Sequence, residues 1–252
     1  MTEALLDVRG LHKSFGGVVA TDNLDIAVSP GEIFAVIGPN GAGKTTLIAQ
    51  LAGALRSDSG RISFDGRDIT RLAPPARAAL GLARTFQITS IFHEFTALEN
   101  VALAVQAHDG HSFRFWKDAR SQARLRDPAL AALDRVGLAD RAQVTARYLS
   151  HGEHRQLEIA MALATEPKML LLDEPMAGMG AEESHRMVDI LQSLKGAQTI
   201  LLIEHDMDAV FALADRITVL VYGRAIATGS ADEIRANPEV RTAYLGEDEV
   251  AV

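Results

Sequence analysis

The sequence predicts an α/β protein with a mainly parallel central sheet. Three short apolar runs, at residues 33–37, 169–172 and 199–203, have the length and composition of strands buried on both faces. Between the last two, residues 181–195 have the pattern of a helix closed by Gly196, which gives the strand, helix, strand order of this fold class. Each run ends at polar residues, and ligands in such folds bind at the carboxyl ends of the strands.

A helical lobe is predicted beside this sheet, over residues 88–165. The segment is rich in Ala, Leu and Arg at helical spacing and lacks comparable β-branched runs. Asp127 followed by Pro128 has the pattern of an N-cap and first helical position, and Gly137 closes that helix. Residues 1–87 and 166–252 are then left to form the core around the sheet.

The C-terminal part is predicted to add a strand and a helix. Residues 224–228 are the strand candidate, and Ser230 with Glu233 has the capping-box pattern of a helix that stops before Pro238. Little chain remains for a separate regulatory domain, so we expect residues 1–252 to form one domain.

Composition excludes several classes of function. A chain of 252 residues that is 48% hydrophobic can bury a sizeable core, and its net charge of -8 argues against nucleic acid as a partner. With no cysteine it has no disulfide, zinc-thiolate site or thiol nucleophile. The N-terminus is unlike a signal peptide, and the apolar runs are far shorter than the roughly 20 residues that span a bilayer. We therefore expect a cytoplasmic protein that reaches a membrane only through a partner.

A phosphate-binding loop follows the first apolar run. Residues 38–45, G-P-N-G-A-G-K-T, match the pattern G-x-x-x-x-G-K-[ST] between a buried strand and an apolar helix that starts near Thr45. The glycines let backbone amides turn toward phosphate oxygens, Lys44 can reach the β and γ phosphates, and Thr45 can bind magnesium. The alternative is a glycine-rich turn with an unrelated lysine, which the strand and helix context disfavours.

The other two runs end in side chains suited to ATP hydrolysis. Asp173 would hold magnesium, and Glu174 would orient or deprotonate the attacking water. His205 follows the third run, where an imidazole can contact the γ-phosphate. The alternatives are a pair of solvated acids and a structural histidine.

Residues 149–153, L-S-H-G-E, resemble the signature sequence of ABC ATPases, usually written L-S-G-G-Q. A serine hydroxyl and free amides at a helix N-terminus form an anion site, although Ser150 could also be an ordinary N-cap. The resemblance implies that Ser150 and Gly152 bind the γ-phosphate of ATP held by a second ATPase chain, identical or related. It also implies an N-terminal antiparallel β portion, and it covers nearly the whole chain.

Further site residues follow from this resemblance. Gln87 matches the glutamine that senses magnesium and the membrane partner, and Phe15 matches the aromatic that stacks on adenine, with a core phenylalanine as the alternative. The family binds nucleotide phosphates along the whole loop. In this chain the loop comprises Gly38, Pro39, Asn40, Gly41, Ala42, Gly43, Lys44, Thr45 and Thr46. ATP and Mg²⁺ are the implied ligands.

The details of the match point to one branch of the family. The form L-S-H-G-E, the stretch A-R-T-F-Q at residues 83–87 and the ending A-Y-L-G-E at residues 243–247 resemble the importer ATPases for branched-chain or hydrophobic amino acids. One departure is Gly180, where relatives usually carry Asp or Asn. It removes a side-chain contact to the partner chain's phosphate loop and puts coupling between the two sites in doubt.

The resemblance also implies membrane-spanning permease subunits as partners, with a solute-binding protein acting indirectly. Ile91, Phe92 and Phe95 are candidates for the permease-docking groove, with the core of the helical lobe as an equal alternative. A second segment combines a basic and an aromatic pattern, which suggests lipid headgroups, although a solvated basic face is the favoured interpretation. Its basic residues are Arg114, Lys117, Arg120 and Arg124, and its aromatic residues are Phe113, Phe115 and Trp116.

The sequence therefore predicts the ATP-hydrolysing subunit of an importer, on the cytoplasmic side of the membrane. Import of a related solute such as urea, an amide or an aromatic acid is one alternative, and a non-transport ABC ATPase is another. The latter usually carries coiled-coil insertions or tandem cassettes, for which this chain has no room. A phosphate-loop kinase would not need Ser150 and Gly152.

Overall fold

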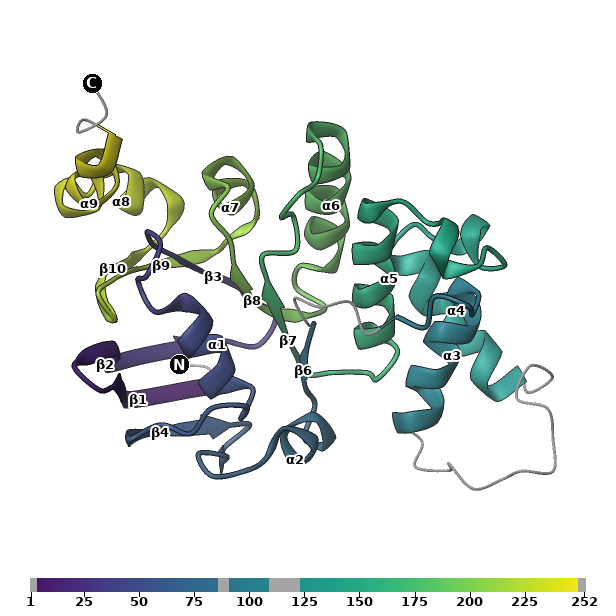
Figure 1. The fold of residues 1–252 in the computed structure, drawn as a ribbon, viewed down its shortest axis with the longest axis horizontal. Coiled ribbons are helices and arrows are strands. Elements are labelled where there is room, and N and C mark those ends of the chain that lie inside the picture. The colour runs from purple at the N-terminus through teal and green to yellow at the C-terminus, as the bar shows by residue number, and fades with distance from the viewer. Residues whose placement is uncertain (1–3, 86–90, 109–122, 249–252) are drawn as a thin grey trace.

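The computed structural model describes residues 4–85, 91–108 and 123–248. The smaller of two sheets and helix α1 lie on one face of the larger sheet, and further helices cover its other face (Figure 1). The helical region formed by α3, α4 and α5 lies at the end of the molecule opposite α8 and α9. The α/β class with a mainly parallel sheet is confirmed.

The larger sheet has six strands in the order β10-β9-β3-β8-β7-β6. All neighbours pair in parallel except β9 and β10, which are antiparallel. The strands are β3 (Ile33–Ile37), β6 (Leu82–Arg84), β7 (Met169–Asp173), β8 (Thr199–Ile203), β9 (Arg216–Val221) and β10 (Arg224–Gly229). Every residue of β3, β7 and β8 is buried, as the apolar runs predict.

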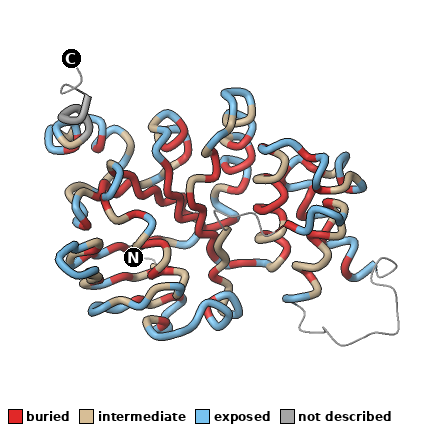
Figure 2. Tube along the Cα trace, viewed as in Figure 1, coloured by how far each residue is buried: buried red, intermediate tan, exposed pale blue. Residues whose placement is uncertain are grey.

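Strand alternation divides the core between the two faces of this sheet. Leu170 and Leu172 of β7 pack into the cluster formed with α3 to α6, whereas Met169 and Leu171 pack with α1 and the smaller sheet. Figure 2 shows the resulting buried band along the central strands. Helices on one face and a second sheet on the other therefore explain why these strands are apolar throughout.

The smaller sheet is antiparallel, in the order β2-β1-β4-β5. Its strands are β1 (Leu6–Phe15), β2 (Val18–Val28), β4 (Ser59–Phe64) and β5 (Arg67–Asp68). It is the N-terminal antiparallel portion that the family resemblance implied. Helix α1 (Lys44–Leu51) buries Leu47, Ile48 and Leu51 in the cluster it shares with this sheet.

The remaining helices surround these sheets. They are α2 (Pro74–Ala79), α3 (Ala97–His108), α4 (Ala123–Arg135), α5 (His151–Leu163), α6 (Ala181–Leu194), α7 (Met207–Leu213), α8 (Ala231–Ala236) and α9 (Pro238–Asp248), with short 3-10 turns η2 (Ala139–Arg141) and η3 (Ala146–Tyr148). Helix α8 begins with the predicted capping box between Ser230 and Glu233 and ends before Pro238.

One predicted helix boundary is wrong. Pro128 lies inside α4 instead of at its first position, because the helix already extends from Ala123. Leu125, one turn before the proline, is buried with Ala129 and Leu133 on the same face. Burial of this face offsets the backbone hydrogen bond that proline cannot donate.

Arg77 of α2 ties the end of α1 to the neighbouring loop. Its guanidinium is buried and donates to the carbonyl oxygens of Gln50 and Leu51 at 2.8 and 2.6 Å, and to those of Thr70 and Leu72 at 3.1 and 3.0 Å. The planar group thus places a positive charge at the C-terminus of α1, where the helix dipole favours it.

We predict that Arg77→Lys lowers the free energy of unfolding by about 2–4 kcal/mol, because one ammonium cannot satisfy all four carbonyl oxygens in this buried position. Urea unfolding followed by circular dichroism measures the change. Arg71→Lys, at an exposed position nearby, is the control. Equal stability of both variants would show that the carbonyl contacts of Arg77 contribute little.

Candidate functional site

The predicted phosphate loop joins the end of β3 to the start of α1. Gly43 precedes the helix with φ of 103°, and a Cβ there would lie 2.0 Å from the carbonyl oxygen of Ala20. Gly38 is similarly confined, with φ of 155° and a Cβ position 2.2 Å from the carbonyl oxygen of Leu220. Both positions therefore need glycine for backbone conformation and for space.

Lys44, the first residue of α1, lies beneath this loop. Its Nζ donates to the carbonyl oxygens of Gly38 at 2.5 Å and Pro39 at 3.1 Å. Burial lowers the pKa of Lys44, while the charges of Glu174 and Asp173 act in the opposite direction. The lysine charge is therefore electrostatically linked to both acids at the end of β7.

Asp173 ends β7 in a buried position and pairs with Arg84 of β6. The distance from the arginine Nη2 to Oδ2 of the carboxylate is 3.1 Å, and the two side chains are 17% and 2% exposed. Burial raises the pKa of Asp173 and Arg84 lowers it. Sequence reasoning missed this partner because the pairing depends on β6 lying beside β7.

Glu174 occupies a strained backbone position directly after the strand. Its φ is 49°, in the left-handed region, and its amide donates to the carbonyl oxygen of Ile203 at 2.9 Å. Such strain in a non-glycine residue persists when the surrounding structure holds it. The hydrogen bond fixes Glu174 beside the end of β8, where the chain continues into His205.

His205 is exposed, but the residue before it is not. Glu204 is fully buried and accepts hydrogen bonds from the amides of Met176 at 2.9 Å and His205 at 3.1 Å. Burial raises its pKa, and these amides lower it. Glu204 thus links the segment after β7 to the end of β8. The sequence signal for Glu204 is its position directly after the apolar run at residues 199–203, but this pattern alone does not predict its partners.

Phe15 ends β1 on the outside of the smaller sheet. It is 50% exposed, and the Nζ of Lys13 lies 5.3 Å from its ring centroid. The alternative that it is a core phenylalanine is therefore wrong. Its register partner across the hairpin is Val18, which is also exposed.

The signature-like residues form the N-terminus of α5. Ser150 is the N-cap and forms a capping box with Glu153, as its residue type permits. In addition, Ser150 Oγ and the amide of Gly152 both donate to Oε1 of Glu183, at 3.1 and 3.3 Å. Sequence patterns do not indicate this contact, because Glu183 lies on a different helix, α6.

Gly180 is the N-cap of α6 and supplies no side-chain hydrogen bond there. The helix begins at Ala181 as predicted. The first turn of the helix contains two acids, Glu182 and Glu183, whose negative charges are favoured by the helix dipole at this end.

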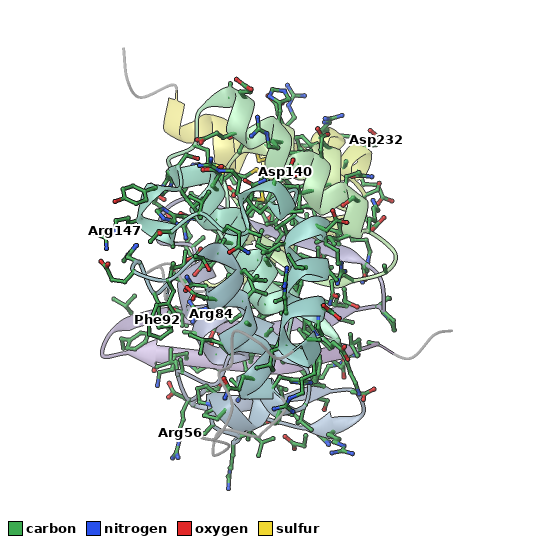
Figure 3. The ribbon with its side chains drawn as sticks, turned by 90° about the vertical axis from the view of Figure 1, so that its right-hand side faces the viewer. Arg56, Arg84, Phe92, Asp140, Arg147 and Asp232 are labelled. Atoms are coloured by element: carbon green, nitrogen blue, oxygen red, sulfur yellow. The ribbon has the colours of Figure 1, made fainter. Side chains whose placement is uncertain are left out.

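Several predicted residues lie outside the described part of the chain. One is Gln87, and the others belong to the basic and aromatic segment: Phe113, Arg114, Phe115, Trp116, Lys117 and Arg120. Arg124 is described and exposed. Of the docking candidates, Ile91 is buried in the helical cluster, which favours the core alternative for this residue. Phe92 and Phe95 are exposed and stack with a centroid distance of 5.5 Å, and Phe92 lies near the edge of the molecule in Figure 3.

The donor groups of the site fit magnesium. Mg²⁺ typically takes one or two protein oxygens and completes its shell with water and substrate phosphates. The buried carboxylate of Asp173 and the hydroxyl of Thr45 are such donors. Within the described residues there is no cluster of three or more His, Cys, Asp or Glu side chains that could form an all-protein metal cage.

Comparison with known proteins identifies the class to which this fold and site belong. A family model described as ABC transporter matches residues 21–177, and one described as branched-chain amino acid ATP-binding cassette transporter matches residues 226–250. The chain therefore belongs to the ABC transporter family of ATP-binding proteins. No helix in the described part of the chain combines the length and apolar composition needed to cross a membrane.

Individual relatives agree with the predicted branch. The chain is 39% identical to the high-affinity branched-chain amino acid transport ATP-binding protein LivG of Escherichia coli strain K12, over 98% of this chain and 100% of LivG. BraF of Pseudomonas aeruginosa, with the same description, is 38% identical over the same shares. A crystal structure of the ADP conformation of an ATP-binding cassette of an ABC transporter is 32% identical, with a TM-score of 0.85 over 97% of this chain and 100% of that one.

We predict that Arg84→Met lowers the free energy of unfolding by about 3 kcal/mol at neutral pH, because it leaves the buried Asp173 carboxylate without its cation. The loss should shrink at acidic pH, where Asp173 takes up a proton. In a double-mutant cycle with Asp173→Asn, the coupling should be about 1–3 kcal/mol. Denaturant unfolding at several pH values measures both quantities, and additive losses would contradict the ion pair.

Proposed function

We propose that this chain is the ATP-binding and hydrolysing subunit of an ABC importer for branched-chain or other hydrophobic amino acids. The observation that carries the proposal is the arrangement of β3, β8 and β7 as parallel neighbours. Their carboxyl ends bring the phosphate loop, His205 and the pair Asp173 and Glu174 to one edge of the sheet. The branched-chain amino acid transport names of LivG and BraF support the choice of solute.

The nucleotide would lie along residues 38–46. Backbone amides of the loop and the N-terminus of α1 suit phosphate oxygens, and Lys44 can exchange its bonds to loop carbonyls for bonds to the β and γ phosphates. Phe15 offers an exposed ring for the adenine. Thr45, Asp173 and Gln87 would hold Mg²⁺, which neutralises phosphate charge when bound.

Hydrolysis would depend on Glu174 and His205. Glu174 accepts a proton from, or orients, the water that attacks the γ-phosphorus, and His205 contacts the γ-phosphate. Ser150 and Gly152 would bind that phosphate from a second ATPase chain, identical or related. A solved cassette that is 22% identical, described as dimeric and bound to ADP and Pi, has the same fold with a TM-score of 0.75.

Membrane-spanning permease subunits would dock beside the segment that contains Gln87. A groove of about 500 Å³ lies there between α2 and β6 on one side and α3 and α5 on the other, with Thr85 in its lining. Most of its other lining residues are apolar, including Leu82 and Met161. The exposed pair Phe92 and Phe95 would extend the docking surface. In this proposal the chain works on the cytoplasmic side of the membrane, a solute-binding protein acts indirectly, and nucleic acid has no role.

Glu174→Gln is expected to retain ATP binding and to reduce hydrolysis by roughly 100 to 10,000-fold, the usual contribution of a positioned general base. Dimers should then accumulate in ATP. Phosphate release and sedimentation measure the two effects. Glu182→Gln, which removes one charge from an exposed side chain, should leave both unchanged. Normal turnover of the Glu174 variant would remove this residue from the mechanism.

A mixture of two inactive variants tests where each site is built. If Lys44 and Ser150 act on the same ATP from different chains, Lys44→Ala and Ser150→Arg each disable both sites of a homodimer. Their mixed dimer contains one site with both defects and one intact site, so ATPase activity should partly return.

The matched control is a tagged heterodimer of one wild-type chain with one Lys44→Ala, Ser150→Arg chain, in which every site carries one defect. It should stay inactive. Given an active wild-type homodimer and an active dimer with a single engineered intact site, a mixture no more active than either variant alone would contradict a site shared between chains.

A further inference from the structure

Glu183 occupies the anion-binding donors at the N-terminus of α5. It projects from the first turn of α6, and its Oε1 accepts hydrogen bonds from Ser150 Oγ at 3.1 Å and from the Gly152 amide at 3.3 Å. A Cβ at position 152 would lie 2.8 Å from this oxygen, so the glycine leaves the approach open. A carboxylate at a helix N-terminus is favoured both by the free amides and by the dipole.

The donors involved cannot serve a second anion at the same time. Ser150 has a single hydroxyl proton, which it donates to Glu183, and its oxygen already accepts from the Glu153 amide. Glu153 in turn accepts from the Ser150 amide and pairs with Arg141. The cavity lined by Ser150, Gly152 and Glu183 measures about 10 Å³, which is too small for a phosphate group while the carboxylate remains.

We propose that Glu183 is an intramolecular competitor for the γ-phosphate of ATP brought by the second chain. The inference rests on the proposed function of Ser150 and Gly152 as ligands of that phosphate. Carboxylate and phosphate are both anionic and need the same two donors, so association of the chains in ATP requires the Glu183 side chain to rotate away. Glu183 therefore weakens association until phosphate displaces it. In the single chain it accepts the hydrogen bonds of Ser150 Oγ and the Gly152 amide.

The neighbouring Glu182 provides a matched control. It lies in the same first turn of α6 and has the same charge, but its side chain is 90% exposed and pairs with Arg186 instead of α5. Substituting either acid changes the net charge and the dipole interaction of α6 equally. Only substitution of Glu183 removes the competitor.

The first test measures ATP-dependent dimerisation in the Glu174→Gln background by analytical ultracentrifugation. Glu183→Ala should lower the protein concentration needed for half-dimerisation on the order of tenfold, which corresponds to the loss of a net hydrogen bond at each of two sites. Glu182→Ala should match the parent. Failure of the Glu183 variant to exceed the parent, whether both dimerise equally or neither does, would overturn the proposal. Weaker dimerisation would do so too, because it would make Glu183 a supporting contact.

The second test uses the single chain without nucleotide. Hydrogen exchange of the Gly152 amide, followed by NMR, should be faster in Glu183→Ala than in the parent and unchanged in Glu182→Ala. Equal exchange in all three would show that the carboxylate does not hold this amide and would also overturn the proposal.

Ser150→Arg in the dimerisation assay distinguishes failure of the proposed function from failure of this inference. If Ser150→Arg leaves dimerisation intact, the proposed role of the signature loop fails. If Ser150→Arg abolishes dimerisation while Glu183→Ala leaves it unchanged, only the role of Glu183 fails.

Discussion

Parallel pairing of β3 with β8 and of β8 with β7 is the constraint on which the site depends. Parallel strands carry their carboxyl ends to the same edge, so residues far apart in the sequence, such as Gly38 and His205, lie at one edge of the sheet. The strands can lie side by side only because both faces of the sheet are covered. Helices α5 and α6 supply apolar side chains on one face, and α1 with the smaller sheet does so on the other.

The groups suited to bind nucleotide are satisfied within the chain by groups of opposite polarity. Lys44 donates to carbonyl oxygens of its own loop, Asp173 pairs with Arg84, and the donors at the start of α5 are held by Glu183. Such contacts avoid the cost of leaving buried charges and donors unpaired. Binding ATP would therefore exchange one set of contacts for another, and its affinity would reflect only the difference between them.

Glu174 and Glu204 show how the segments after β7 and β8 are joined. The Glu174 amide donates to the last carbonyl of β8, and the buried Glu204 accepts from the Met176 amide. In both links an amide of the segment after β7 donates to an oxygen at the end of β8. They explain how a non-glycine residue keeps a positive φ at position 174.

The buried strands, the phosphate loop and the start of α8 follow from local sequence patterns. The apolar runs specify buried strands because each side chain in them must leave water, and the glycines around Lys44 specify the loop because no other residue fits the backbone there. Local patterns also fixed the capping box at Ser230, whose two partners are three residues apart. Pro128 was misplaced because burial of Leu125, a tertiary effect, extends α4 past the local stop signal.

Only the tertiary structure decided which charged groups meet. Arg84 and Asp173 are 89 residues apart, and Ser150 and Glu183 are 33 apart on different helices. No periodicity links the members of such pairs, because their distance depends on strand order and helix packing. The sequence thus identified the chemical groups of the site, whereas the fold determined which of them restrain one another.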